Sequence, residues 1–139
     1  MDTFYLEILS PTRTFYAGEC VFVSMPISDG MIGIMAHHTN LCAAIEDGEI
    51  DFTLPNGEKI TCAVTRGMVD FTDNRAQILC ESALYPYEIN EDEEARLLEE
   101  AKLELSKKQG EKEYALWQLS LNKAVNHLKV KNKQKNINL

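Results

Sequence analysis

The side chains most capable of chemistry in this sequence are its four cysteines and three histidines. The cysteines, Cys20, Cys42, Cys62 and Cys80, lie far apart and form no Cys-x-x-Cys pair. Their spacing fits neither a zinc site nor a redox pair. Each lies in or beside an apolar stretch, where a free cysteine behaves as a small hydrophobic residue. We therefore predict that the cysteines are core residues.

The histidines also lack the arrangement of a metal site. His37 and His38 are adjacent, and adjacent residues on a strand point to opposite faces, so the pair cannot bind one metal ion. His127 lies much later in the chain, and no third ligand is evident. We expect the histidines to pack or to lie on the surface, with contact to a partner protein as the main alternative.

Motifs for catalysis or phosphate binding are absent from the sequence. It contains no G-x-x-x-x-G-K-[ST], no G-x-G-x-x-G and no G-x-S-x-G. The acids at 91–94 lack the glycine and the ligand spacing of a calcium loop. Trp117 lies at helical spacing from other apolar residues, a position that is more typical of a core residue than of a residue that stacks on a cofactor. The sequence predicts a non-enzymatic protein without a metal or a cofactor.

Charge is distributed unevenly along the chain. The formal net charge is −8, which argues against a general nucleic-acid binder because phosphate binding requires a basic face. Residues 1–88 carry 13 acids against 4 basic residues, a net −9, whereas residues 113–139 carry 1 acid against 5 lysines, a net +4. This asymmetry indicates a tail that is attracted to an acidic surface, its own or a partner's, or a solvated terminal run.

Two kinds of targeting segment are missing from the sequence. No run approaches the roughly 18 apolar residues that a membrane helix needs. The first residues also lack the basic start and apolar stretch of a secretory signal. We expect a soluble, intracellular protein without direct membrane insertion.

The apolar pattern up to about residue 88 is short and alternating. It has the period of two of half-buried strands at residues 4–8, 21–25 and 50–54. Turn signals follow at Asn56-Gly57, Arg66-Gly67 and Asp73-Asn74-Arg75. Regularly spaced turns between short strands predict an antiparallel β-sandwich of about ten strands over residues 1–86.

The pattern then changes to a helical period, which gives a β + α fold. Asn90 and Glu93 form a capping box, and acids crowd the first turn of the helix that follows. Gln109-Gly110 breaks the pattern before a second helix. We predict an antiparallel helical hairpin over residues 89–131 and a frayed basic tail at 132–139. Its contact stripe is alanine-rich and narrow, so we expect a hairpin that does not stand alone and can move.

Several segments occur in an order and spacing that are known from one family. They are Phe4–Pro11, Phe15–Glu19, Asp29–Leu41, Arg66–Phe71 and Glu113–Val130. In this order they resemble the epsilon subunits of bacterial-type F-type ATP synthases along nearly the whole chain. The segment Asp29–Leu41 is similar to the family pattern DGxxGILxGHxPL, and it departs from it at His37, where glycine is usual, and at Asn40, where proline is usual.

The resemblance implies a non-catalytic subunit of the rotor's central stalk, which couples the gamma stalk to the c-ring during proton- or sodium-driven ATP synthesis. It implies a place on the cytoplasmic face of the cell membrane, as a peripheral part of the synthase. By resemblance, the residues that contact the rotor ring of c subunits are Asp29, Met31 and His38. The residues that contact gamma are Ser10, Thr39, Asn40 and Leu41.

The resemblance also implies that the helical hairpin regulates the enzyme. In this family the hairpin is either folded on the sandwich or extended beside gamma. When extended, it meets acidic segments of the catalytic beta subunits in the alpha/beta head and blocks ATP hydrolysis. The basic side chains that would make this contact are Lys107, Lys108, Lys123, His127 and Lys129.

Some family members bind ATP between the sandwich and the hairpin, at a first helix that begins IDxxRA. The corresponding stretch here is Ile89–Glu94, in which Glu93 replaces the arginine and Glu94 replaces the alanine. The comparable basic positions on the second helix are Lys123 and His127. Because carboxylates repel a triphosphate, we expect weak or no ATP binding.

The main alternative is a hairpin-bearing adaptor or regulator of another complex, such as a factor that probes a polymerase channel. Those factors carry acids at the hairpin tip to hold a metal. The tip here is Lys107-Lys108-Gln109-Gly110, which is basic. A small-molecule enzyme that uses cysteine and histidine is a third and weaker alternative.

Overall fold

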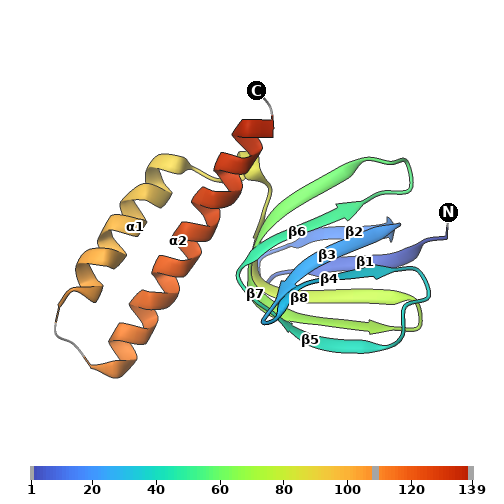
Figure 1. Ribbon diagram of the computed structural model, residues 1–139, viewed down its shortest axis with the longest axis horizontal. Coiled ribbons are helices and arrows are strands. Elements are labelled where there is room, and N and C mark those ends of the chain that lie inside the picture. The colour runs from blue at the N-terminus through green and yellow to red at the C-terminus, as the bar shows by residue number, and fades with distance from the viewer. Residues whose placement is uncertain (1, 108–109, 138–139) are drawn as a thin grey trace. The chain divides into compact units, whose positions relative to one another are not determined.

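The computed structural model describes residues 2–107 and 110–137, the last three of them by their backbone. It divides the chain into two compact units, a strand unit over Met1–Tyr85 and a helical unit over Pro86–Leu139 (Figure 1). The predicted combination of a β-sandwich with a pair of C-terminal helices is confirmed.

The strand unit contains eight strands, fewer than the roughly ten expected. They are β1 (Phe4–Leu9), β2 (Thr14–Cys20), β3 (Phe22–Ile27), β4 (Gly30–Met35), β5 (Leu41–Ile45), β6 (Gly48–Thr53), β7 (Lys59–Thr72) and β8 (Arg75–Leu84). They form one sheet in the order β2-β1-β8-β7-β6-β3-β4, and β5 also pairs with β7. One pair, β1 with β8, is parallel, which corrects the expectation of a purely antiparallel sandwich. A parallel pair needs a long crossover, and here the six intervening strands provide it.

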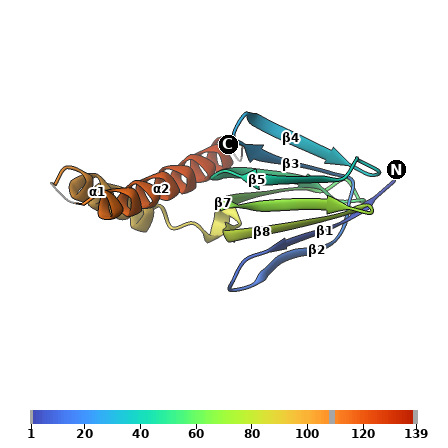
Figure 2. The same ribbon diagram turned by 90° about the horizontal axis from the view of Figure 1, so that it is seen from below.

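Strand β7 joins the two layers of the sandwich. Its first half pairs with β6, and its second half pairs with β5 on one edge and β8 on the other. Figure 2 shows β3 and β4 on one side of β7 and β8, with β1 and β2 on the other. The turn predicted at Arg66-Gly67 is wrong, because the strand runs through it. Glycine is needed at 67 for a different reason: a Cβ there would overlap the carbonyl oxygen of Leu79 and lie 2.7 Å from the Cα of Cys80.

The other two predicted turns are confirmed. Asp73 and Asn74 both have positive φ, 51° and 58°, as a two-residue hairpin turn requires. Gly57 has a φ of 90°, and the side chain of Asn56 accepts a hydrogen bond from the Glu58 amide. The sequence signal was correct here because each turn is local.

The core of the strand unit lies between its layers and is made of aromatic and aliphatic side chains. Phe4 and Phe71 meet edge to face, with ring centroids 5.7 Å apart. The side chains with no exposed surface include Leu6, Ile8, Val23, Met25, Ile34, Ile50, Val64, Val69, Phe71 and Ile78. In strands such as β1 and β8, alternation sorts residues into a buried and an outward set, as the period of two predicts, whereas Cys62–Thr65 of β7 are all buried.

Three of the four cysteines are core residues, as predicted, and the fourth is not. Cys20, Cys62 and Cys80 are buried and free. Burial raises the pKa of the Cys80 thiol to about 11 and raises the pKa of Cys62 further. Cys42 is exposed, because β5 turns this residue outward beside Asp70 of β7.

The helical unit begins with a 3-10 turn and continues as two helices that lie side by side (Figure 1). These are η1 (Pro86–Glu88), α1 (Glu91–Leu105) and α2 (Glu111–Ile137). The predicted cap is confirmed, since the side chain of Asn90 accepts a hydrogen bond of 3.0 Å from the Glu93 amide. Helix α2 continues to Ile137, past residue 131 where we expected the hairpin to end. Neither helix of the described chain is long and apolar enough to cross a membrane.

Little apolar surface is buried within the helical unit. Ala101 is the buried residue of α1, and Ala124, His127 and Val130 are the buried residues among the described side chains of α2. Ala95 and Tyr114 lie at the helical spacing of the apolar stripe in the sequence, but both are exposed. The fully buried side chains of the two helices are therefore small apart from a histidine, while larger apolar side chains such as Leu98, Trp117 and Leu128 are half-buried.

Candidate functional site

The residues predicted to contact the rotor ring lie at the two ends of β4. Asp29 lies in the turn that precedes the strand, where Gly30 has a φ of 130° that side chains rarely adopt. Met31 follows, with 58% of its surface exposed. His38 lies beyond the other end of β4, whose 6 residues span about 20 Å at the usual strand rise. The structure therefore does not bring His38 together with Asp29 and Met31.

The residues predicted to contact gamma are also divided. Ser10 follows β1, whose last residue Leu9 pairs with Leu79. Leu41 begins β5 at the opposite end of the same layer, where it pairs with Phe71. Thr39 and Asn40 precede it directly. Ser10 and the Thr39–Leu41 segment therefore lie at opposite ends of one layer.

His38 belongs to the Thr39 end of this layer. Its ring meets Phe71 edge to face at 5.9 Å between centroids, and its Nδ1 lies 2.7 Å from the carbonyl oxygen of Thr39. The neighbouring His37 has a φ of 66°, and its amide donates a 2.8 Å hydrogen bond to the side chain of Asn74. This part of the strand unit is thus held by local hydrogen bonds and ring contacts.

An outward-facing apolar row, which we did not predict from the sequence, crosses the layer between those two ends. Neighbouring strands pair Ala44 with Met68, Met68 with Leu79, and Leu79 with Leu9. Met68 is 53% exposed and Leu79 is 51% exposed. In the sequence, the row is marked by apolar residues at strand positions that point outward and are usually polar. Met68 precedes the buried Val69 in this way, and Leu79 follows the buried Ile78. We call these four residues the outer row.

A second group of exposed apolar side chains lies on β3 and β4. Phe22 pairs with Met35 across the two strands, and both are exposed, as is Met31. Gly33 leaves room for the Phe22 ring, because a Cβ at that position would lie 2.9 Å from it. Exposed apolar groups of this kind are typical of contact surfaces.

The basic residues predicted to contact the beta subunit differ in how accessible they are. Lys123 and Lys129 are exposed on α2. Lys107 lies 3.0 Å from the carboxylate of Glu104, so its charge is partly neutralised. Lys108 lies outside the described residues.

The fifth predicted basic residue, His127, is not a surface group in this structure. It is 1% exposed, and its Nδ1 lies 2.9 Å from Oε1 of Glu94 on α1. No local pattern indicates this contact, because the two residues are 33 positions apart. His127 is therefore a packing residue in this hairpin, and its predicted contact with the beta subunit, which belongs to the extended state, stays a prediction.

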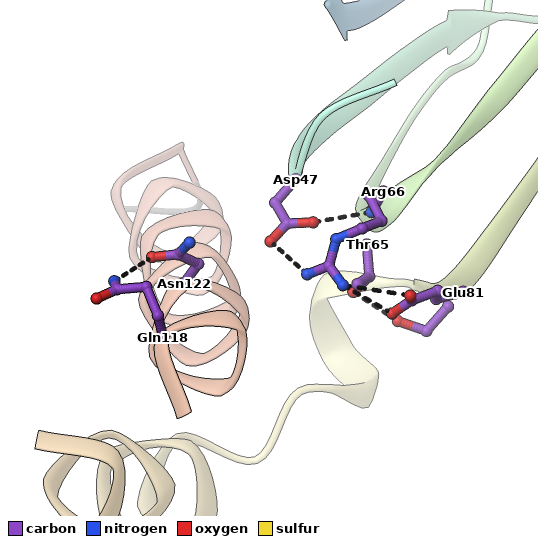
Figure 3. A network of polar contacts seen from close by, with 7 residues as sticks. Asp47, Thr65, Arg66, Glu81, Gln118 and Asn122 are labelled. Atoms are coloured by element: carbon purple, nitrogen blue, oxygen red, sulfur yellow. Dashed lines mark hydrogen bonds and ion pairs between the residues drawn. The ribbon is translucent and has the colours of Figure 1, made fainter. Parts of the chain in front are cut away.

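A polar network around Arg66 has a structural role (Figure 3). The Arg66 guanidinium lies 3.3 Å from Asp47 and 3.2 Å from Glu81, and its amide donates a 2.8 Å hydrogen bond to Asp47. Beside it, Ser82 and the buried Thr65 hydroxyl are 2.8 Å apart. These contacts tie the β5–β6 connection to β7 and β8 where β7 passes between layers.

No cluster of three or more histidine, cysteine or acidic side chains in the described part of the chain could hold a metal ion. The strand unit presents apolar and polar side chains that can contact a partner. The helical unit presents exposed lysines, and the interface between its two helices (the seam) is thinly packed. The arrangement is suited to binding other proteins.

Comparison with known proteins gives a consistent result. Residues 3–86 match the family model described as the ATP synthase delta/epsilon chain, beta-sandwich domain. The ATP synthase epsilon chain of Ruminiclostridium cellulolyticum is 31% identical over 97% of this chain and 100% of its own length. That of Nitratiruptor sp. is 33% identical over 73% of this chain and 79% of its own length.

Solved structures show the same fold. A chain in the cryo-EM structure of the Euglena gracilis mitochondrial ATP synthase, OSCP/F1/c-ring, superposes with a TM-score of 0.75. The match has 17% identity and covers 86% of this chain and 76% of that one.

Proposed function

Because this chain belongs to the family of ATP synthase delta and epsilon chains, we propose that its strand unit is a fixed coupling in the rotor and its helical unit a movable brake. The chain is a non-catalytic subunit of the central stalk of the F-type ATP synthase. The proposal concerns which surfaces meet which partners and how hydrolysis is controlled.

The outer row is the proposed docking surface for gamma. It is apolar and exposed, and it crosses the layer whose two ends carry Ser10 and the Thr39–Leu41 segment. One partner surface laid along this layer touches both ends and the row between them. His38 joins this gamma-facing set, because it packs beside Thr39.

The turn before β4 is the proposed contact with the c-ring. Asp29 and Met31 lie together there, and Met31 is exposed. A short polar turn with one apolar side chain suits the polar loops of a membrane ring. This contact would hold the chain at the membrane surface as a peripheral part of the complex.

The helical unit is the proposed brake, in which Lys123 and Lys129 meet acidic segments of the beta subunits when the helices separate. At a rise of 1.5 Å per residue, α1 spans about 22 Å and α2 about 40 Å. When α1 no longer lies alongside α2, the helical unit lengthens by up to the length of α1, which is about half of the length of α2. The observation that carries the proposal is the thin seam between the helices, which makes their separation inexpensive.

Reconstitution tests the proposal. The full chain should bind gamma and lower the ATPase rate of an epsilon-depleted catalytic head. A chain ending at residue 88 should bind gamma equally well and leave the rate unchanged. Failure of the full chain to bind gamma would overturn the proposed coupling, and inhibition by the truncated chain would overturn the proposed brake.

A further inference from the structure

The two helices share a buried polar contact between Glu94 and His127. The side chains are 14% and 1% exposed, and Nδ1 lies 2.9 Å from Oε1. The other buried residues of the seam, Ala101, Ala124 and Val130, are small. A charge-assisted contact in such surroundings contributes more than one on the surface.

Three other ion pairs among the described residues of the helices lie within or at the end of α1 and do not join α1 to α2. Arg96 with Glu100 and Lys102 with Glu99 each lie along α1 and are exposed. Lys107 pairs with Glu104 at the end of α1. Such pairs stabilise the helices individually and have little effect on whether the helices stay together.

The contact is imperfect as well as buried. Nε2 of His127 is buried and has no hydrogen-bond partner among the described residues. An unsatisfied buried nitrogen costs free energy in the closed state. If either partner is removed, however, the other is left buried and unpaired, which costs more. A contact with these properties favours closure without making it permanent.

Its position gives it leverage over opening. Glu94 is in the first turn of α1, at the end of the helical unit farthest from the connection between Leu105 and Glu111. His127 is 16 residues from the start of α2, or about 24 Å along the helix. Helices that separate about their connection move most at this end.

Other charged groups lie near the contact. On α2, Lys123 and Lys131 are each four residues from His127, and Lys131 donates a 3.0 Å hydrogen bond to the Pro86 carbonyl oxygen of η1. On α1, Glu91 lies one turn before Glu94. Lys131 thus adds a tether from α2 to the start of the unit, next to the buried pair.

We propose that Glu94 and His127 form an internal clasp that sets the fraction of chains whose helices are closed. No ligand is required, because both halves of the clasp belong to the chain. The consequence for ATP hydrolysis rests on the proposed brake: a broken clasp leaves more helices extended and therefore inhibits more strongly.

Hydrogen exchange of the full-length chain tests the clasp directly. Glu94→Ala and His127→Ala should each raise the exchange rates of α2 amides roughly 10- to 100-fold. The double variant Glu94→Leu/His127→Leu should return to within about threefold of the original rates, because apolar replacement of both partners removes the unpaired group. Arg96→Ala, which breaks an exposed pair on the same helix, should change the rates less than about threefold.

Each result decides one of the two proposals. If the single variants exchange like the original chain, or the double variant exchanges as fast as the singles, the clasp is wrong. The double variant still tests the clasp even if a single substitution prevents the two helices from packing together at all. If exchange responds as expected while inhibition of the reconstituted ATPase does not change, the clasp stands and the proposed brake fails.

Discussion

The strand unit and the helical unit bury their side chains in very different ways. Between its layers the strand unit encloses aromatic and aliphatic residues such as Phe4, Phe71 and Ile78. The fully buried side chains of α1 and α2 are two alanines, a valine and a histidine that pairs with a glutamate, and the larger apolar side chains of these helices are at most half-buried. Since stability follows the apolar area removed from water, one unit is suited to constant shape and the other to opening. This contrast fits the proposed function, in which the strand unit is the attachment and the helical unit the moving part.

Among substitutions that test the difference between the two units, the largest loss of stability is expected in the sandwich core. Phe71→Ala should lower the free energy of unfolding of the strand unit by about 3 to 5 kcal/mol, because it removes a fully buried ring. Urea unfolding followed by circular dichroism measures it. Phe22→Ala, at a 37% exposed ring, is the matched control and should cost clearly less. Equal losses in the two variants would contradict the assigned core.

The next effect concerns the strand that joins the layers. Gly67→Ala should destabilise the strand unit by about 3 kcal/mol, because its methyl group overlaps the backbone of β8. Gly110→Ala places a methyl group in open space in the helical unit and should leave the sheet unaffected. Thermal unfolding of both variants shows whether glycine is needed at position 67 because the β8 backbone approaches closely or because the chain turns there. A tolerated Gly67→Ala would favour the turn that the sequence suggested.

A smaller effect is expected in the helical unit alone. Asn90→Ala removes the cap of α1 and should cost about 1 kcal/mol of helix stability. Exchange of α1 amides should become faster while the strands keep their rates. Asn122→Ala, which removes an exposed contact with Gln118 on α2, serves as a control with little expected change. If Asn90→Ala changed the amide exchange rates of the helices and of the strands equally, the two units would unfold together.

The smallest effect lies at the Thr39 end of the strand unit. His37 has a φ of 66°, which suits glycine better than histidine. Relief of this strain is partly offset by the greater freedom of glycine in the unfolded chain, so His37→Gly should raise stability by less than about 1 kcal/mol. A melting-temperature comparison with His38→Gly measures it. A clear loss of stability on His37→Gly would mean that the His37 side chain contributes more than its backbone costs.

Local features of the fold could be predicted from the sequence, and non-local ones could not. The Asn90 cap and the Asp73-Asn74 turn depend on neighbouring residues, and both were identified correctly. The parallel pairing of β1 with β8 joins distant segments and left no local pattern. Gly67 was misread because glycine serves both turns and close backbone approaches.

The contact surfaces show the same limit. The outer row consists of single apolar residues on four strands, so it becomes visible once the register is known. The sequence left open whether His127 packs or lies on the surface, and only the pairing of α1 with α2 places Glu94 beside it. Family resemblance named the segments that we propose to meet partners, but pairing across the sheet decided which of them lie together.

Native-state hydrogen exchange of the unmodified chain in low concentrations of urea shows whether the helical unit opens independently of the strand unit. We expect α1 and α2 to exchange through openings that leave the strands folded, with α2 amides at least about 100-fold faster than those of β1, β7 and β8. If helices and strands instead exchange at one rate with one dependence on urea, the chain is a single cooperative unit. The helical pair could not then act as a separate moving part.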